Sequence, residues 1–215
     1  MKLPVPAGLS CLLLLVTTGA LPAADVTFTV RDARGGPVAD AVVSLHPLGP
    51  APAPAVPGEA VIAQEDKEYD PYVTPVLVGT KVRFPNRDSI QHHIYSVSRP
   101  KRFEKPLYGG GAEESVVFDQ PGVVVLGCNI HDWMIAYVVV LPTPHFAKTD
   151  ATGRARLAGP GAGRYRLEIW HPRLAKTETR ELELSAAGHA PVAVELNLRP
   201  DRRIRRAPEN RTGGY

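Results

Sequence analysis

Two valine-rich runs joined by a tight loop constrain the fold of this chain more than any other feature. The runs Val123–Leu126 and Ile135–Leu141 consist mainly of β-branched and other apolar residues, which is typical of buried strands. Between them stands Gly-Cys128-Asn-Ile-His131-Asp-Trp-Met134. The sequence therefore predicts two strands that present a thiol, an imidazole and a thioether in one turn.

These three side chains indicate a copper site for one-electron transfer. A soft thiolate with two imidazoles and a long, weak thioether contact is a ligand set that holds copper in electron-transfer proteins. The loop supplies Cys128, His131 and Met134, so the second imidazole must come from another part of the fold. An upstream segment that ends in His92 and His93 offers it.

The first 24 residues have the pattern of a secretory signal peptide. A basic Met1-Lys2 start is followed by the apolar run Leu9–Val16 and by small residues up to Ala24. The apolar run is too short to span a bilayer, which takes ~20 residues. We therefore expect residues 1–24 to direct export to a bacterial periplasm, and we expect no transmembrane segment.

The cysteine count supports a metal-bound thiolate. Cys11 would leave with the signal peptide, so the exported chain keeps Cys128 as its single cysteine. Exported proteins usually use cysteines in pairs as disulfides, and an odd one needs another explanation. A buried apolar cysteine is the simple alternative. His131 and Met134 favour a metal ligand, because metal binding protects a thiolate from oxidation.

The remaining composition indicates an all-β chain. The 22 prolines and 19 glycines divide the sequence into short segments, and no apolar stripe of helical period extends over a helix-length window. Short β-branched runs recur between turn signals, which is typical of a β-sandwich or barrel.

The charge distribution argues against a nucleic-acid partner. The net charge is only +3, and six arginines lie in residues 199–215, so the rest of the chain is close to neutral. We expect residues 199–215 to form a basic, disordered tail. The alternative is a docking tail for an acidic partner or an anionic membrane, acting through Arg202, Arg203, Arg205 and Arg206.

The two ends of the chain resemble a carboxypeptidase regulatory-like, or transthyretin-like, β-sandwich. Strand-like runs at 26–30 and 41–45 flank a Gly-Gly-Pro turn, and the family's Thr-Asp-x-x-Gly and Gly-x-Tyr-x-Leu elements are matched at 149–153 and 163–167. The resemblance implies a sandwich interrupted by an insertion, which surface loops tolerate. The expected organisation is a sandwich formed by residues 25–48 and 143–198, a Pro/Ala linker at 49–58 and an inserted domain at 59–142.

The inserted residues resemble a cupredoxin. The resemblance runs from Gln64 to Leu141 and rests on the Asn86-containing strand and loop, the Asp-Gln-Pro-Gly approach to the cysteine, and a Cys-x-x-His-x-x-Met spacing similar to that of amicyanin. It implies a Greek-key barrel that binds one copper ion. The implied ligands are His92, Cys128 and His131, with Met134 axial.

The same resemblance implies a function. It points to a periplasmic mononuclear (type 1) copper protein that transfers single electrons to or from a redox protein and is not an enzyme. Similar exported bacterial proteins are often labelled methylamine utilization proteins. Two alternatives are a copper-delivery protein with the same ligands but no redox partner, and a metal-free envelope-binding β-sandwich module.

His93 departs from the blue-copper pattern, in which asparagine commonly follows the first ligand histidine. Adjacent residues of a strand point to opposite faces, so His92 and His93 are not both expected to bind one ion. The neighbouring residues leave the choice open, since both faces could be core. The resemblance favours His92 as the ligand, and we expect His93 to brace the ligand loop.

A redox partner is expected to dock on an apolar patch around His131. The nearest candidates in the sequence are Ile130, Trp133 and the segment Pro142–Pro144. Surface or structural roles are expected for the other histidines, namely His46, His145, His171 and His189.

Overall fold

The expectation of an all-β chain is confirmed. The computed structural model describes residues 25–50, 55–186 and 189–203, and these ranges contain seventeen strands and no helix. The predicted signal peptide and most of the predicted basic tail, including Arg205 and Arg206, lie outside the described residues. The ranges also lack any helix with the length and hydrophobicity that a membrane span requires.

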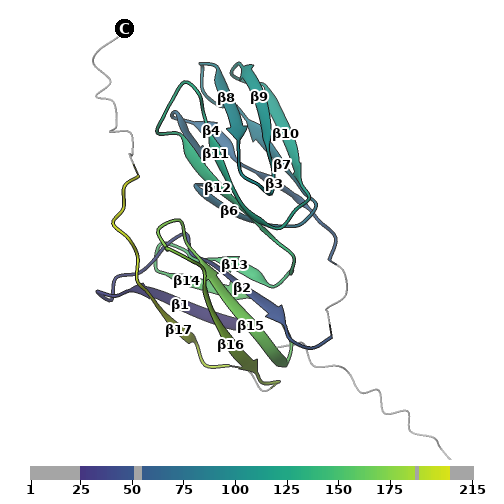
Figure 1. Cartoon of the computed structure of the whole chain (residues 1–215), viewed down its shortest axis with the longest axis vertical. Coiled ribbons are helices and arrows are strands. Elements are labelled where there is room, and N and C mark those ends of the chain that lie inside the picture. Colours follow the sequence, from purple (N-terminus) through teal and green to yellow (C-terminus); the bar gives the residue numbers. More distant parts are fainter. Residues whose placement is uncertain (1–24, 51–54, 187–188, 204–215) are drawn as a thin grey trace, which may run out of the picture.

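Strands from both ends of the chain pair with each other. One sheet has the order β14 (Arg154–Leu157), β1 (Val26–Asp32), β17 (Val192–Leu196). A second has the order β13 (Phe146–Lys148), β2 (Val42–Pro47), β15 (Gly163–Trp170), β16 (Glu178–Leu184). Figure 1 shows these strands together in the lower part of the molecule.

Apolar residues at alternate positions explain why these two sheets face each other. In β1, Val26, Phe28 and Val30 are buried while the residues between them are partly exposed, as a strand with one face toward a core requires. They share a core cluster with Leu45 of β2 and Leu167 of β15. The two sheets are therefore held together by one continuous apolar core.

Thr149 links the two ends of the chain with two buried hydrogen bonds. Its hydroxyl accepts a hydrogen bond of 2.9 Å from the Ala41 amide, which is 108 residues away in sequence. It donates one of 2.7 Å to the Val38 carbonyl, which is 111 residues away. Buried backbone polar groups need such partners. The Thr-Asp element in which Thr149 stands thus has a structural role in this part of the fold.

The central residues form three further sheets. One has the order β10 (Glu113–Phe118), β7 (Thr80–Pro85), β3 (Glu59–Val61), and β4 (Ala63–Glu65) pairs with β5 (Glu68–Asp70). The largest has the order β6 (Val73–Leu77), β12 (Ile135–Leu141), β11 (Gly122–Gly127), β8 (His92–Ser96), β9 (Phe103–Tyr108). These strands occupy the upper part of Figure 1.

The valine-rich runs form the antiparallel pair β11 and β12, as the sequence predicted. Their register sets Val123 opposite Val139 and Gly127 opposite Ile135, so residues 128–134 connect the two strands at one end of the sheet. Only glycine fits at position 127, because a Cβ atom there would lie 2.8 Å from the Tyr95 ring. The Tyr95 ring of β8 can therefore pack directly on the backbone that leads to Cys128.

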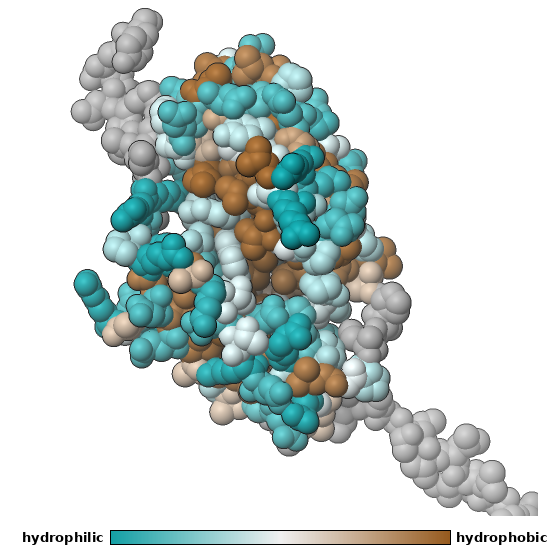
Figure 2. Space-filling view, in the orientation of Figure 1, coloured by the Kyte–Doolittle hydropathy of each residue, from teal (hydrophilic) through white to brown (hydrophobic). Residues whose placement is uncertain are grey.

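A third apolar cluster joins the upper and lower parts of the molecule. Its buried members are Val42 of β2 and Val73, Val139 and Leu141 of the central strands. Tyr137 of β12 packs on Trp170 of β15 with 5.4 Å between the ring centroids. Figure 2 shows apolar side chains gathered at the waist of the molecule, framed by polar ones above and below.

Candidate metal centre

The structure brings three of the four predicted ligands together. His92 begins β8, Cys128 follows β11, and His131 lies in the loop to β12. One ligand atom from each lies within 4.8 Å of the others. The Cys128 Sγ to His131 Nδ1 distance is 3.8 Å, and the His92 and His131 ring centroids are 5.0 Å apart. His92 and Cys128 are buried, whereas His131 is half-buried.

Met134 lies at the C-terminal end of the same loop. Its amide donates a hydrogen bond of 3.0 Å to the His131 carbonyl, which closes the turn between them. Its side chain is buried in the same core cluster as Cys128. The thioether and the thiol are thus part of one buried apolar cluster.

The His92 ring is oriented for ligation through Nδ1. Its Nε2 lies 2.7 Å from Asp88 Oδ2, and a carboxylate only accepts hydrogen bonds, so the proton is on Nε2. The other nitrogen, Nδ1, is buried and has no hydrogen-bond partner among the described residues. Leaving a buried polar atom without a partner costs about 1–3 kcal/mol. A metal ion at Nδ1 would remove that cost.

Asp88 connects His92 to the tip of the β4–β5 hairpin. Its carboxylate accepts the amides of Asp66 and Lys67 at 2.8 and 2.9 Å. Burial alone would raise the pKa of Asp88, but the hydrogen bonds from the Lys67 amide, the His92 ring and the Asp66 amide together lower it. Asp88 therefore stays ionised and fixes the His92 ring from outside the donor cluster.

The same hairpin tip also holds the ligand loop. The Trp133 indole N–H donates to the Lys67 carbonyl at 3.0 Å, and the Trp133 and His131 ring centroids are 5.2 Å apart. The turn at Asp66 and Lys67, both of which have positive φ, thus contacts the two segments that carry the predicted ligands.

Two buried side chains fix the backbone around the site. The Asn86 amide donates to the carbonyls of Ile90 and Tyr108 at 2.8 and 3.0 Å, which shapes the loop before His92. The Tyr69 hydroxyl lies 3.2 Å from the His93 carbonyl and 3.0 Å from the Gly127 carbonyl. Burial strongly raises the pKa of Tyr69, so this hydroxyl keeps its proton and joins β8 to the end of β11.

The His93 ring contacts residues outside the donor cluster. Its Nε2 is 2.8 Å from Glu104 Oε1 and 3.4 Å from Asn129 Nδ2. Its Nδ1, like that of His92, is buried without a partner among the described residues, so proximity to Cys128 and His131 is what distinguishes His92. The contact with Asn129 places His93 beside the residue that follows Cys128.

The surface next to the ligand loop is partly apolar. Ile130 is 49% exposed and Leu107 of β9 is 48% exposed, and both line a shallow depression with Pro106 and His93. The expectation that Pro142–Pro144 contributes to this surface is wrong. The loop precedes β12 and that segment follows it, so the full length of the strand separates them. Thr143 instead bonds the Leu45 carbonyl at 2.8 Å.

His171 and His46 contact groups outside the donor cluster. His171 is buried, its Nδ1 accepts the Arg173 amide at 3.1 Å, and burial lowers its pKa to about 4, so the neutral ring is part of the fold. The His46 Nε2 lies 3.1 Å from Ser44 Oγ and 3.4 Å from Glu168 Oε2. A hydrolytic relay needs the acid on the other ring nitrogen, so this arrangement is not one.

Comparisons with solved structures find cupredoxins. A purple cupredoxin from Nitrosopumilus maritimus is 29% identical and aligns over 38% of this chain and 99% of its own, with a TM-score of 0.35. A copper-containing nitrite reductase from Thermus scotoductus is 25% identical over 45% of this chain and 25% of its own, with a TM-score of 0.38. A Cu(I) amicyanin variant is 23% identical and aligns over 39% of this chain and 83% of its own, with a TM-score of 0.37.

No protein-family model matches the chain, and no curated protein matches its sequence. The function of the site is therefore inferred from its own geometry.

Replacing Asp88 with Asn is expected to weaken metal binding. The amide keeps the shape of the carboxylate but loses its charge, so it holds the His92 N–H less strongly. Loss of such an outer contact typically lowers metal affinity about 10–100-fold. Competition with a copper(I) chelator measures the change, with Asp66→Asn, which removes the same charge from the hairpin tip that Asp88 contacts, as the control. Equal losses in both variants would contradict the role of Asp88.

Proposed function

We propose that this chain is a mononuclear copper protein of the cupredoxin type that transfers single electrons after export to the periplasm. The observation that carries the proposal is the cluster of His92, Cys128 and His131, with donor atoms within 4.8 Å and a buried His92 Nδ1 that has no other partner among the described residues. Bound copper would supply a one-electron couple.

The donor set supports copper over hard ions. Thiolate sulfur suits Cu(I), imidazole nitrogen suits Cu(II), and a set of both serves the two oxidation states without exchange of ligands. Met134, which is buried in the same core cluster as Cys128, would add a soft sulfur atom. Hard ions such as Mg²⁺ and Ca²⁺ prefer oxygen ligands, which this cluster does not offer.

The surroundings keep the ligands in place during electron transfer. Asp88 fixes the His92 ring, the Tyr69 hydroxyl joins the two ligand-bearing backbones, and Trp133 ties the loop to the β4–β5 hairpin. Ligands that are held by packing and outer hydrogen bonds have little freedom to rearrange. This rigidity suits an electron carrier better than a protein that must release its copper.

Copper retention and reversible voltammetry test the proposal. The purified chain is expected to bind one copper ion per molecule, to retain it against a chelator and to give a reversible one-electron wave. Binding with ready loss to the chelator and no reversible wave would favour copper delivery. Absence of stoichiometric binding would contradict both and leave the chain as a metal-free β-sandwich module.

We further propose that electrons pass through the His131 edge and that partners dock on the apolar surface formed by Ile130, Leu107 and Pro106. Transient redox interfaces are small, below ~1,200 Å² in total, so one charge can disturb them. Ile130→Lys is expected to slow electron self-exchange between copies roughly fivefold, because two like charges in contact repel by about 1 kcal/mol in water. Line broadening in NMR spectra of mixed oxidation states measures the rate.

Val97→Lys is the matched control for this variant. Val97 is 76% exposed and follows β8 at the end away from His92, so the same charge there should leave self-exchange unchanged. If Ile130→Lys has no effect while Arg202→Glu changes the rate, docking depends on the C-terminal basic segment instead.

A further inference from the structure

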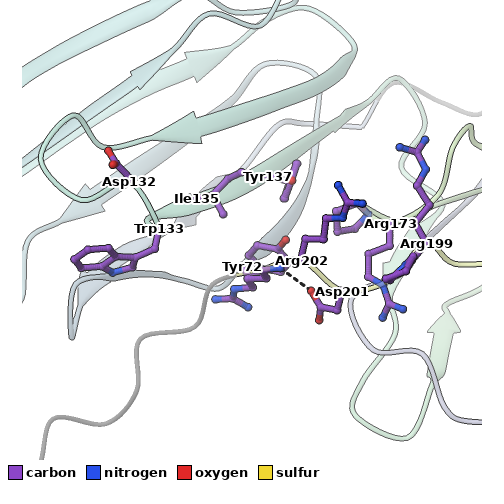
Figure 3. Close-up of a pocket in the computed structure, with 12 residues that line it drawn as sticks. Tyr72, Asp132, Trp133, Ile135, Tyr137, Arg173, Arg199, Asp201 and Arg202 are labelled. Atoms are coloured by element: carbon purple, nitrogen blue, oxygen red, sulfur yellow. Dashed lines mark hydrogen bonds between the residues drawn. The ribbon is translucent and has the colours of Figure 1, made fainter.

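A cavity of about 540 Å³ lies between the ligand loop and the C-terminal segment. Trp133 of the loop and Tyr137 of β12 form part of its wall, and Arg173 and Arg199 come from the part of the chain that contains β15 to β17. Figure 3 shows Trp133 at one end of the cavity and Arg173 with Arg199 at the other. The cavity therefore has an aromatic end beside the ligand loop and a basic end away from it.

Several contacts fix the wall of this cavity. The Arg203 guanidinium stacks 3.8 Å from the Tyr72 ring centroid and pairs with Glu68 at 2.8 Å. Arg173 Nε donates to the Arg199 carbonyl at 2.7 Å, and the Arg199 amide donates back to the Arg173 carbonyl at 3.0 Å. Residues 199–203 are thus attached at both ends, and the cavity is a built feature of the fold.

The cavity has a surplus of positive charge. Four arginines line it, against the two acids Asp132 and Asp201. Glu68 neutralises Arg203. The guanidinium groups of Arg199 and Arg202 have no ion pair or hydrogen bond to any residue that the structure describes. Guanidinium groups match carboxylates and phosphates with paired hydrogen bonds, so these two side chains are available to an anion.

We propose that this cavity binds a small organic anion with a flat aromatic body. The aromatic body would pack against Trp133, Tyr137 and Tyr72, since offset aromatic pairs are favourable. The anionic group would meet Arg199 and Arg202 at the basic end. A volume of about 540 Å³ is in the range of small-molecule sites, which often lie between structural units.

The position of the cavity connects a bound anion to the ligand loop. Trp133 lines the cavity and its ring centroid is 5.2 Å from that of His131. Occupancy is expected to change the surroundings of His131. The binding itself does not depend on copper, so it is tested on the copper-free chain.

Titration calorimetry with 2-naphthoate and its uncharged analogue 2-naphthamide tests the proposal. The full copper-free chain is expected to bind the carboxylate at one saturable site and the amide about fivefold more weakly, because an exposed ion pair contributes up to ~1 kcal/mol. The double variant Arg199→Gln, Arg202→Gln should lose about tenfold in affinity for the carboxylate by the same reasoning. Arg99→Gln, on a distant exposed loop, should lose none.

A second readout locates the site. The chain has two tryptophans, so its amide-correlation NMR spectrum has two indole N–H signals. The Trp133 signal is expected to move with saturation and to move further than that of Trp170, whose ring contacts Tyr137 of the cavity wall but does not line the cavity. Equal affinity for the carboxylate and the amide, an equal loss in Arg99→Gln, or movement of the Trp170 signal alone would overturn the proposal. None of these outcomes bears on copper binding.

Discussion

Replacing Cys128 with Ser is expected to abolish the visible colour of the copper-loaded protein. In the proposed site the colour arises from charge transfer between the Cys128 thiolate and copper. Ser nearly keeps the size of the side chain, which is only 3% exposed, so the fold should survive. The hydroxyl does not provide the soft anionic sulfur that the site requires. Visible absorption of both proteins after copper loading measures the effect.

The two histidines of β8 give this experiment a matched pair of controls. His92→Gln should lose the colour as well, because it removes an imidazole of the donor cluster. His93→Gln should keep it, since that ring faces Glu104 and Asn129. If the Ser variant keeps the colour, or if His93→Gln and not His92→Gln loses it, the assignment of ligands is wrong.

Removal of residues 59–142 is expected to leave a folded β-sandwich. We propose that the two ends of the chain form one folding unit, because β1 pairs with β14 and β17 and β2 pairs with β13 and β15. β2 and β13 are antiparallel, with Ser44 opposite Phe146, so a short turn can join them as a hairpin. Circular dichroism during thermal unfolding should show one cooperative transition.

The deletion exposes the apolar cluster at the waist, and this exposure favours aggregation even where the fold is kept. Trp170 and Phe146 are the large residues that lose their cover, so a second deletion variant that also carries Trp170→Thr and Phe146→Thr should restore solubility. Protection of the β1 and β15 amides from hydrogen exchange in either deletion variant would support the proposal. A molten product in both would mean that the ends depend on the central strands.

The β11–β12 pair and the ligand loop follow directly from the sequence because their signals are local. Both strands are dense in β-branched residues, and the ligand loop lies between them in sequence. The assignment of Pro142–Pro144 to the loop surface failed for a physical reason. A strand extends about 3.3 Å per residue, so β12 carries the chain to the other end of the sheet.

The roles of Tyr69 and Asp88 could not be predicted from the sequence. Tyr69 bonds to carbonyls 24 and 58 residues away, and Asp88 bonds to amides 21 and 22 residues away. Such contacts depend on the packing of short strands with no periodic signal. The sequence shows a carboxylate four residues before His92, but the orientation of this carboxylate depends on the loop geometry that Asn86 imposes.

The choice between His92 and His93 shows a similar limit. Both side chains are buried, so hydrophobic alternation does not distinguish the two faces of β8. A register shift between His92 and Ile94 further disturbs the pairing with β9. The three-dimensional positions of Cys128 and His131 are what separate the two histidines.

X-ray absorption at the copper edge of the loaded, full-length chain tests the central claim most directly, because it identifies the atoms bound to copper. The proposed site predicts one short copper–sulfur contact from Cys128 together with two imidazole nitrogens from His92 and His131, and loss of the short sulfur contact in Cys128→Ser. A first coordination shell made of nitrogen and oxygen alone would contradict the account.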